Sequence, residues 1–68
     1  MDKELILKNN IKAVRTSQKI SQEELANLVG TTRQTIIAIE KGQFNPSAKL
    51  ALLICVALNV KFEELFYF

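Results

Sequence analysis

The chain has 68 residues, of which 49% are hydrophobic and 24% are charged, and its formal net charge is +2. This length predicts one domain, residues 1–68, and the composition is that of a soluble globular protein rather than a disordered chain. The first ten residues carry both charge signs and only three consecutive apolar residues. We therefore expect no signal peptide, no transmembrane span and no membrane partner, and a cytoplasmic location.

Basic side chains are concentrated in two segments. Residues 3–19 hold five lysines or arginines against one acidic residue, and residues 33–49 hold three against one. The rest of the chain holds five acidic residues against one lysine. This distribution suits a molecule that turns one side towards a polyanion, although a solvated basic face would give the same pattern.

The first predicted helix starts near Asn9 or Asn10, either of which can cap it, and ends near Ser17. The apolar residues 5–7 fit either an extension of this helix or a short terminal strand.

The second helix carries a clearer signal, because Ser21 followed by Glu24 forms a capping box. Gly30 ends that helix. Its predicted buried face consists of Leu25, Leu28 and Val29.

Two further helices follow the second. Thr32 can cap a helix over residues 33–41 that Gly42 closes, and Ser47 can cap another that ends near Leu58. Both caps are residues whose side-chain oxygen can accept from a free backbone N–H. No stretch of helical length alternates between apolar and polar residues with period two, so we expect an all-α fold.

A last helical segment is predicted close to the C-terminus. Phe62, Leu65 and Phe66 recur at i, i+3 and i+4, which places them on one side of a helix. Glu63 and Glu64 fall near its start, where negative charge is favourable.

The second and third helices are joined by only Gly30, Thr31 and Thr32, so they must cross steeply, which predicts a helix-turn-helix unit. In such a unit the second helix presents its N-terminal side chains to base edges in the major groove. An ordinary helical hairpin is the plain alternative. The outward residues of the second helix of the unit are Arg33, Gln34, Ile37 and Ala38.

These outward side chains suit base recognition. Arg33 can donate twice to guanine, Gln34 can pair with adenine, and Ile37 can contact a thymine methyl group. The alternative is that Arg33 and Gln34 are simply solvated. For the phosphates we expect Gln22, at the start of the second helix, and nearby cations. The candidate cations are Lys12, Lys19 and Lys41.

The stretch SQEELANLVGTTRQTIIAIEKGQFNPS resembles the phage repressor and Cro type of helix-turn-helix family, also called the xenobiotic-response-element type. The resemblance covers roughly residues 9–66. The segments RQTI, IEKG and NPS are similar to small stand-alone bacterial regulators of the cytolysin-repressor kind. The resemblance implies a five-helix, lambda-repressor-like fold, a twofold dimer and a pseudo-palindromic DNA operator.

Several residue roles are carried over by position. The resemblance implies that Gln22 and Thr32 contact phosphates and that Arg15 and Glu40 form a partly buried salt bridge. It also places four residues against bases: Arg33, Gln34, Ile37 and Ala38. The chain departs from the family pattern at Thr31 and Lys61, and also at Leu53 and Val56, which stand where polar residues are frequent.

The fourth predicted helix is apolar on most sides, so one core-facing stripe cannot explain it. That stripe consists of Ala51, Ile54, Cys55 and Leu58. The apolar residues left over would form an exposed patch that a homodimer could cover. We expect the interface to contain Leu52, Leu53, Val56, Phe62, Phe66, Tyr67 and Phe68.

The predicted function is a sequence-specific transcriptional regulator, most simply a repressor, with double-stranded DNA and a second copy of the chain as partners. The alternative is an antitoxin-like module that binds a protein and regulates its own gene. Cys55 is the single cysteine and there is no histidine, so we expect a buried hydrophobic role for Cys55, no metal site and no cofactor. An enzyme is not expected, since no nucleophile–base pair or glycine-rich phosphate loop is present.

Overall fold

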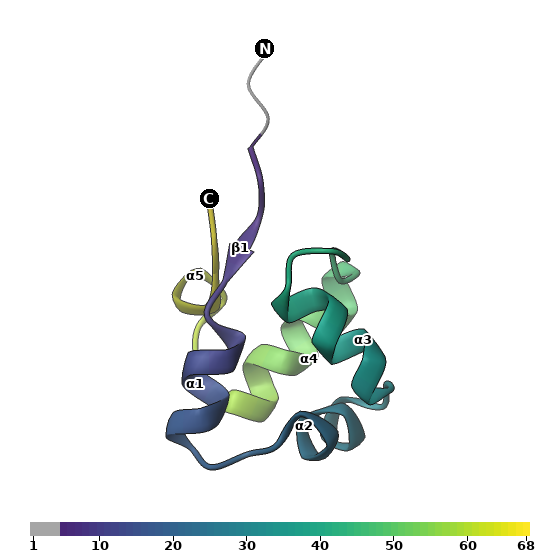
Figure 1. Ribbon diagram of the computed structural model, residues 1–68. Helices are drawn as coiled ribbons and strands as arrows, with labels where there is room; N and C mark the ends of the chain where they lie inside the picture. Colours follow the sequence, from purple (N-terminus) through teal and green to yellow (C-terminus); the bar gives the residue numbers. More distant parts are fainter. Residues whose placement is uncertain (1–4) are drawn as a thin grey trace.

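The computed structural model describes residues 5–68, which form five helices and a short terminal strand pair (Figure 1). The predicted helical class with a possible terminal strand is confirmed. Lys3 and Glu4, which entered the charge pattern, lie outside the described residues. The elements are β1 (Lys8–Asn9), α1 (Ile11–Ser17), α2 (Gln22–Val29), α3 (Arg33–Glu40), α4 (Ala48–Leu58), α5 (Phe62–Leu65) and β2 (Phe66–Tyr67).

Local side-chain chemistry starts most of the helices where the sequence predicts. The Ser21 hydroxyl accepts from the backbone N–H of Glu24 at 3.0 Å, and the Glu24 carboxylate accepts from the backbone N–H of Ser21 at 2.8 Å. At α3 and α4 the hydroxyls of Thr32 and Ser47 accept from the backbone N–H three residues later, without a reciprocal side-chain bond. At α1 the side-chain acceptor is Asn9, whose Oδ1 receives the N–H of Ile11 at 3.2 Å. These caps satisfy backbone donors that have no partner within the helix.

The two ends of the described chain pair as an antiparallel sheet, with Lys8 opposite Tyr67 and Asn9 opposite Phe66. Residues 5–7 belong neither to α1 nor to a strand, because the strand starts at Lys8. The expectation that Phe66 continues the last helix is wrong. The chain leaves α5 after Leu65, and Phe66 adopts extended backbone in β2 because β1 is there to pair with it.

The core lies between the helices and is almost entirely apolar. Its most deeply buried side chains are Ile11, Leu25, Ile36, Ile39, Ile54, Leu58 and Leu65. The predicted stripe of α4 is confirmed, since Ala51, Ile54, Cys55 and Leu58 are all buried.

The predicted buried face of α2 is wrong at one position. Leu28 is 63% exposed, whereas Ala26 is buried beside Leu25 and Val29. Leu25, Ala26 and Val29 share one face of the helix, and the helical period places Leu28 to the side of that face.

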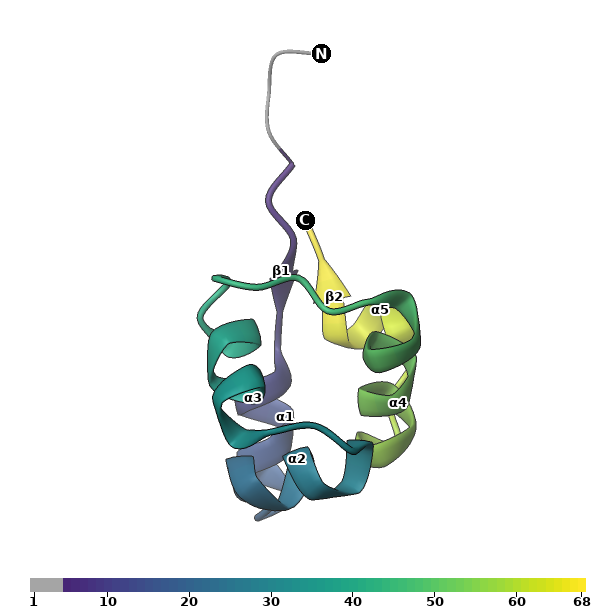
Figure 2. The ribbon, with the colours of Figure 1, turned by 90° about the vertical axis from the view of Figure 1, so that its right-hand side faces the viewer.

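The helices are arranged so that α3 stands at one side of the molecule. Figure 2 shows α3 and α4 on opposite sides, with α2 across the bottom and the strand pair between them at the top. α2 packs against both α3 and α4. Within residues 5–68, no helix has the length and apolar character needed to cross a bilayer.

Candidate nucleic-acid interface

The turn between α2 and α3 is built on Gly30. Gly30 has a φ of +75°, a left-handed conformation that other residues adopt at a steric cost. The next residue, Thr31, donates its backbone N–H to the carbonyl of Ala26 at 2.9 Å, which closes the end of α2. Thr32 then caps α3 immediately. The two helices therefore follow each other with the tight connection of a helix-turn-helix unit.

α3 has an inner and an outer side. Ile36 and Ile39 are buried against the rest of the fold. Arg33 and Gln34 are exposed at the start of the helix, and two further outward candidates, Ile37 and Ala38, are half-buried. Arg33 and Gln34, at the N-terminal end of α3, are therefore accessible to a large ligand such as double-stranded DNA.

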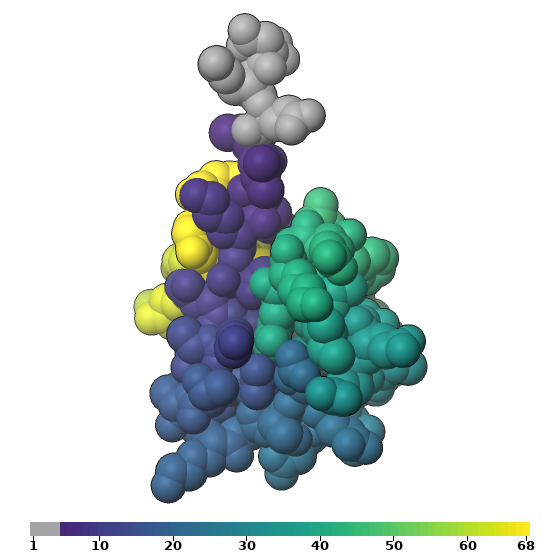
Figure 3. All heavy atoms as spheres, in the orientation of Figure 1, coloured from purple at the N-terminus to yellow at the C-terminus, as the bar shows by residue number. Residues whose placement is uncertain are grey.

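Arg33 also borders a cleft of about 460 Å³. The cleft is lined by Lys12, Arg15, Ser21, Gln22, Glu23 and Arg33. It brings Lys12 of α1 and Arg33 of α3 together at the start of α2, where free backbone N–H groups favour an anion. Figure 3 shows α1 and α3 side by side on one face of the molecule, with α2 at its lower edge.

The remaining predicted cations lie elsewhere. Lys19 is exposed in the turn after α1 and has a φ of 60°. Lys41 follows α3 and lines a separate hollow beside β1. The structure therefore places Lys12 in the cleft beside Arg33, but it does not bring Lys19 or Lys41 into that cleft.

Arg15 and Glu40 connect α1 with the end of α3. The Arg15 Nε donates to Glu40 Oε2 at 2.8 Å, and both side chains are less than one tenth exposed. Gln22 donates through Nε2 to Glu40 Oε1 at 3.0 Å. The Gln22 amide is therefore engaged with Glu40 as well as lying in the cleft, so its phosphate role stays a prediction.

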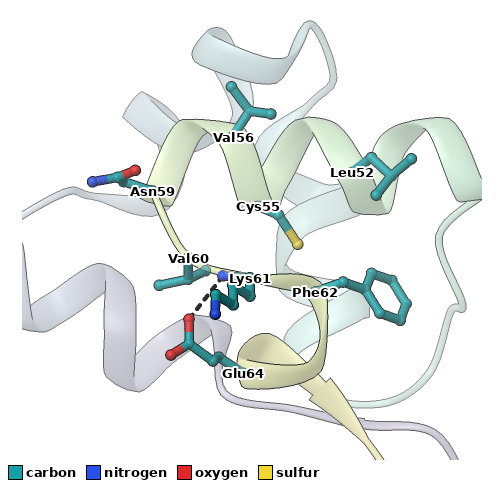
Figure 4. A pocket seen from close by; sticks show the side chains of 8 residues that line it. All are labelled: Leu52, Cys55, Val56, Asn59, Val60, Lys61, Phe62 and Glu64. Atoms are coloured by element: carbon teal, nitrogen blue, oxygen red, sulfur yellow. Dashed lines mark hydrogen bonds between the residues drawn. The ribbon is translucent and has the colours of Figure 1, made fainter.

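Only some of the residues expected in an apolar patch on α4 and the C-terminal segment lie on one surface. Leu52, Val56 and Phe62 are exposed and line one hollow of about 760 Å³, in which Figure 4 shows Leu52 and Phe62 at the same end. Leu53 is exposed on α4 but does not line this hollow, and Tyr67 lines the hollow beside β1.

Phe66 does not belong to the patch. It is only 3% exposed, and its ring stacks on Phe62 with centroids 5.1 Å apart. The expectation that Phe66 is exposed is therefore wrong, because β2 turns this side chain into the core. Phe68, by contrast, is exposed. We call Leu52, Val56 and Phe62 the α4–α5 face.

Cys55 lines the hollow of the α4–α5 face from α4. Burial raises the pKa of its thiol, which favours the uncharged form at neutral pH. The thiol therefore acts as a small apolar side chain in this structure, as the sequence predicts.

Sequence reasoning missed Phe44 beside the exposed side of α3. This side chain is half exposed in the loop after α3, and it shares a shallow hollow with Gln34 and Ala38. The loop is held close to α3 because Gln43 donates its backbone N–H to the carbonyl of Ala38 at 2.9 Å. The sequence signal for it is an aromatic residue in a polar loop, two positions before Pro46.

The fold and the geometry of the α2–α3 turn define a helix-turn-helix protein. Residues 11–65 match the helix-turn-helix family, and the chain belongs to that family.

Three proteins of known sequence or structure are similar to this chain. The HTH-type transcriptional regulator YgzD of Bacillus subtilis is 49% identical over 61 residues, covering 90% of this chain and 92% of YgzD. The restriction-modification controller protein C.AhdI of Aeromonas hydrophila is similar in structure, with a TM-score of 0.75 and 35% identity, over 79% of this chain and 82% of C.AhdI. Antitoxin PezA of Streptococcus pneumoniae is 32% identical over 56 residues, which are 82% of this chain and 35% of PezA.

Proposed function

We propose that the protein is a sequence-specific transcriptional regulator that binds a pseudo-palindromic DNA operator as a homodimer and represses by occluding a promoter. The observation that carries the proposal is the exposed pair Arg33 and Gln34 at the start of α3, directly after the tight turn. In helix-turn-helix proteins this end of the second helix enters the major groove. Family membership and the names of the relatives support the same reading.

In this proposal Arg33 and Gln34 read base edges, Ile37 and Ala38 make apolar contacts in the groove, and Thr32 meets a phosphate. Lys12 and Gln22 border the cleft beside Arg33 and would hold the adjoining phosphate. The outlying cations, Lys19 and Lys41, add sequence-independent attraction. A regulator of this kind acts where chromosomal DNA lies, which agrees with the cytoplasmic location expected from the sequence.

A homodimer is proposed because one recognition helix reads only a few base pairs. A twofold partner on the α4–α5 face would cover its exposed apolar side chains and place a second recognition helix about one DNA turn away. Leu53, Tyr67 and Phe68, which the sequence also assigns to the interface, are exposed, but none of them lines the hollow of the α4–α5 face. Phe66 contributes only from beneath, through its stacking on Phe62.

An antitoxin-like role is the second candidate, and one observation favours it. PezA, an antitoxin, aligns with most of this chain but with only about a third of its own length. In that case the α4–α5 face would cover a protein partner and DNA binding would be autoregulatory.

Selection of bound duplexes from a random DNA pool tests the main proposal. A regulator of this kind enriches two copies of one short sequence in inverted orientation. Enrichment of a single half-site, or of no sequence, would contradict the dimeric reading. Purification of the natural complex would reveal a toxin-sized partner if the antitoxin reading is correct.

A further inference from the structure

Asn9 joins three parts of the fold. Its Nδ2 donates to the backbone carbonyl of Ile39 at 2.9 Å, across thirty positions of the sequence. Its Oδ1 accepts from the N–H of Ile11 at 3.2 Å, and its backbone lies opposite Phe66 in the strand pair. The side chain therefore bridges the start of α1 and the last turn of α3, while the backbone is fixed to β2.

The Ile39 carbonyl belongs to the end of α3, where carbonyls lack partners within the helix and carry partial negative charge. The N–H of Gly42 also donates to this carbonyl, at 3.0 Å. Asn9 supplies a second donor from outside the helix and its following turn. It thus restrains the end of α3 opposite to the one that carries Arg33 and Gln34.

The other side of this connection reaches the α4–α5 face. Phe66, opposite Asn9 in the strand pair, stacks on Phe62. Asn10 adds a second tie, because its backbone N–H donates to the carbonyl of Leu65 at 2.9 Å. A continuous series of contacts therefore runs from the α4–α5 face through β2 and Asn9 to the end of α3.

We propose that Asn9 is a positioning residue that sets the direction of α3 relative to the α4–α5 face and so fixes the half-site spacing that a dimer accepts. This inference rests on the proposed dimeric DNA binding. Two recognition helices must enter the groove about 34 Å apart, one helical turn. A change in the direction of α3 in each subunit alters that separation twice, once on each side of the twofold axis.

The test compares two variants that change charge equally. Asn9→Asp keeps the oxygen that accepts from Ile11 but places an oxygen opposite the Ile39 carbonyl, where a donor is required. Asn10→Asp is the matched control, because it leaves the backbone bond from Asn10 to Leu65 in place and changes only a side chain that donates to the carbonyl of Glu64 at 3.2 Å and not to α3. Binding is measured on a series of duplexes in which the spacer between two selected half-sites varies by one base pair at a time.

The parent protein and Asn10→Asp should share one preferred spacing. For Asn9→Asp, the ratio of the affinity at that spacing to the affinity at neighbouring spacings should fall about tenfold. This is the size expected when one such hydrogen bond is replaced by a repulsive contact. Circular dichroism should show the same helical content for all three proteins, and sedimentation should show that all three are dimers. If Asn9→Asp does not fold, Asn9→Ser, which is too short to reach Ile39 and adds no charge, is expected to give the same loss of preference.

Identical spacing profiles for the folded Asn9 variant and the control would overturn the inference. A uniform loss of affinity at every spacing would overturn it too, since that result describes weaker binding and not altered geometry. A parent protein with no preferred spacing contradicts dimeric operator binding itself, and the inference with it. If the parent protein prefers one spacing and Asn9→Asp keeps that preference, the result contradicts the role of Asn9 but not dimeric operator binding.

Discussion

Arg15 holds the end of α3 from α1 through its ion pair with Glu40. The Nε to Oε2 distance is 2.8 Å, and the two side chains are 7% and 6% exposed. The guanidinium also donates through Nη1 to the carbonyl of Ile20 at 2.9 Å, and Gln22 donates to the other Glu40 oxygen. A buried pair that is satisfied in this way is costly to break from one side, because the remaining charge stays buried.

Glu40→Ala should therefore lower the free energy of unfolding by on the order of 3–5 kcal/mol, since Arg15 is left without its carboxylate. Urea denaturation measures this change. Glu23→Ala, which removes an exposed carboxylate from α2, should change it by only a few tenths of a kcal/mol. Equal midpoints for Glu40→Ala and the parent protein would show that the pair does not stabilise the fold.

The capping box at the start of α2 should make the free energy of unfolding depend on pH in the acid range. The backbone N–H of Ser21, and next its side chain, lower the pKa of Glu24 below its ordinary value. Because the folded pKa is depressed, this stabilisation is fully present above the unfolded pKa and is lost as the pH falls through the folded pKa.

Glu24→Gln removes that titration. The difference in unfolding free energy between the parent and Glu24→Gln should be largest near neutral pH and should shrink in acid. Glu23→Gln, one residue earlier on the exposed side of α2, is the control. A difference that stays constant across the acid range would contradict a role for the ionised carboxylate.

The exposed apolar side chains of α4, which are Val56 in the α4–α5 face and Leu53 outside its hollow, should control assembly. Replacing Leu53 and Val56 with lysine places two charges on exposed positions of α4, one of them 77% exposed, so the fold should survive while a dimer dissociates. Sedimentation should show a monomer, and binding to an operator with two half-sites should lose its cooperativity. Leu28→Lys, at an exposed leucine of α2, is the control. A parent protein that is monomeric at high micromolar concentration, or a double variant that still dimerises, would place the interface elsewhere.

Local chemistry made much of the fold predictable. The caps at Ser21, Thr32 and Ser47 depend on residues three positions apart, and the buried stripe of α4 follows from the helical period. Leu28 and Phe66 also fit that period, yet the first is exposed and the second lies in a strand. Their places depend on contacts between distant segments, which a local pattern does not contain.

The same limit applies to the candidate site. The tight turn and the outward polar pair of α3 could be read from Gly30 and the residues that follow it. The cleft shared by Lys12 and Arg33, the exposed Phe44 and the bond from Asn9 to Ile39 could not, because each joins segments that only the folded chain brings together.

Base recognition by Arg33 is tested most directly by Arg33→Lys on operator and unrelated duplexes. The variant keeps the positive charge but loses the two parallel hydrogen bonds that a guanidinium can donate to guanine. Operator binding should weaken by about 1–3 kcal/mol for each half-site and preference should relax at one position of each, while binding to unrelated DNA stays the same. Lys12→Ala, the phosphate control, should weaken both and reduce the salt slope by about 1 for each subunit bound. Equal affinity of Arg33→Lys and the parent for the operator, or equal losses on both duplexes, would contradict sequence reading by α3.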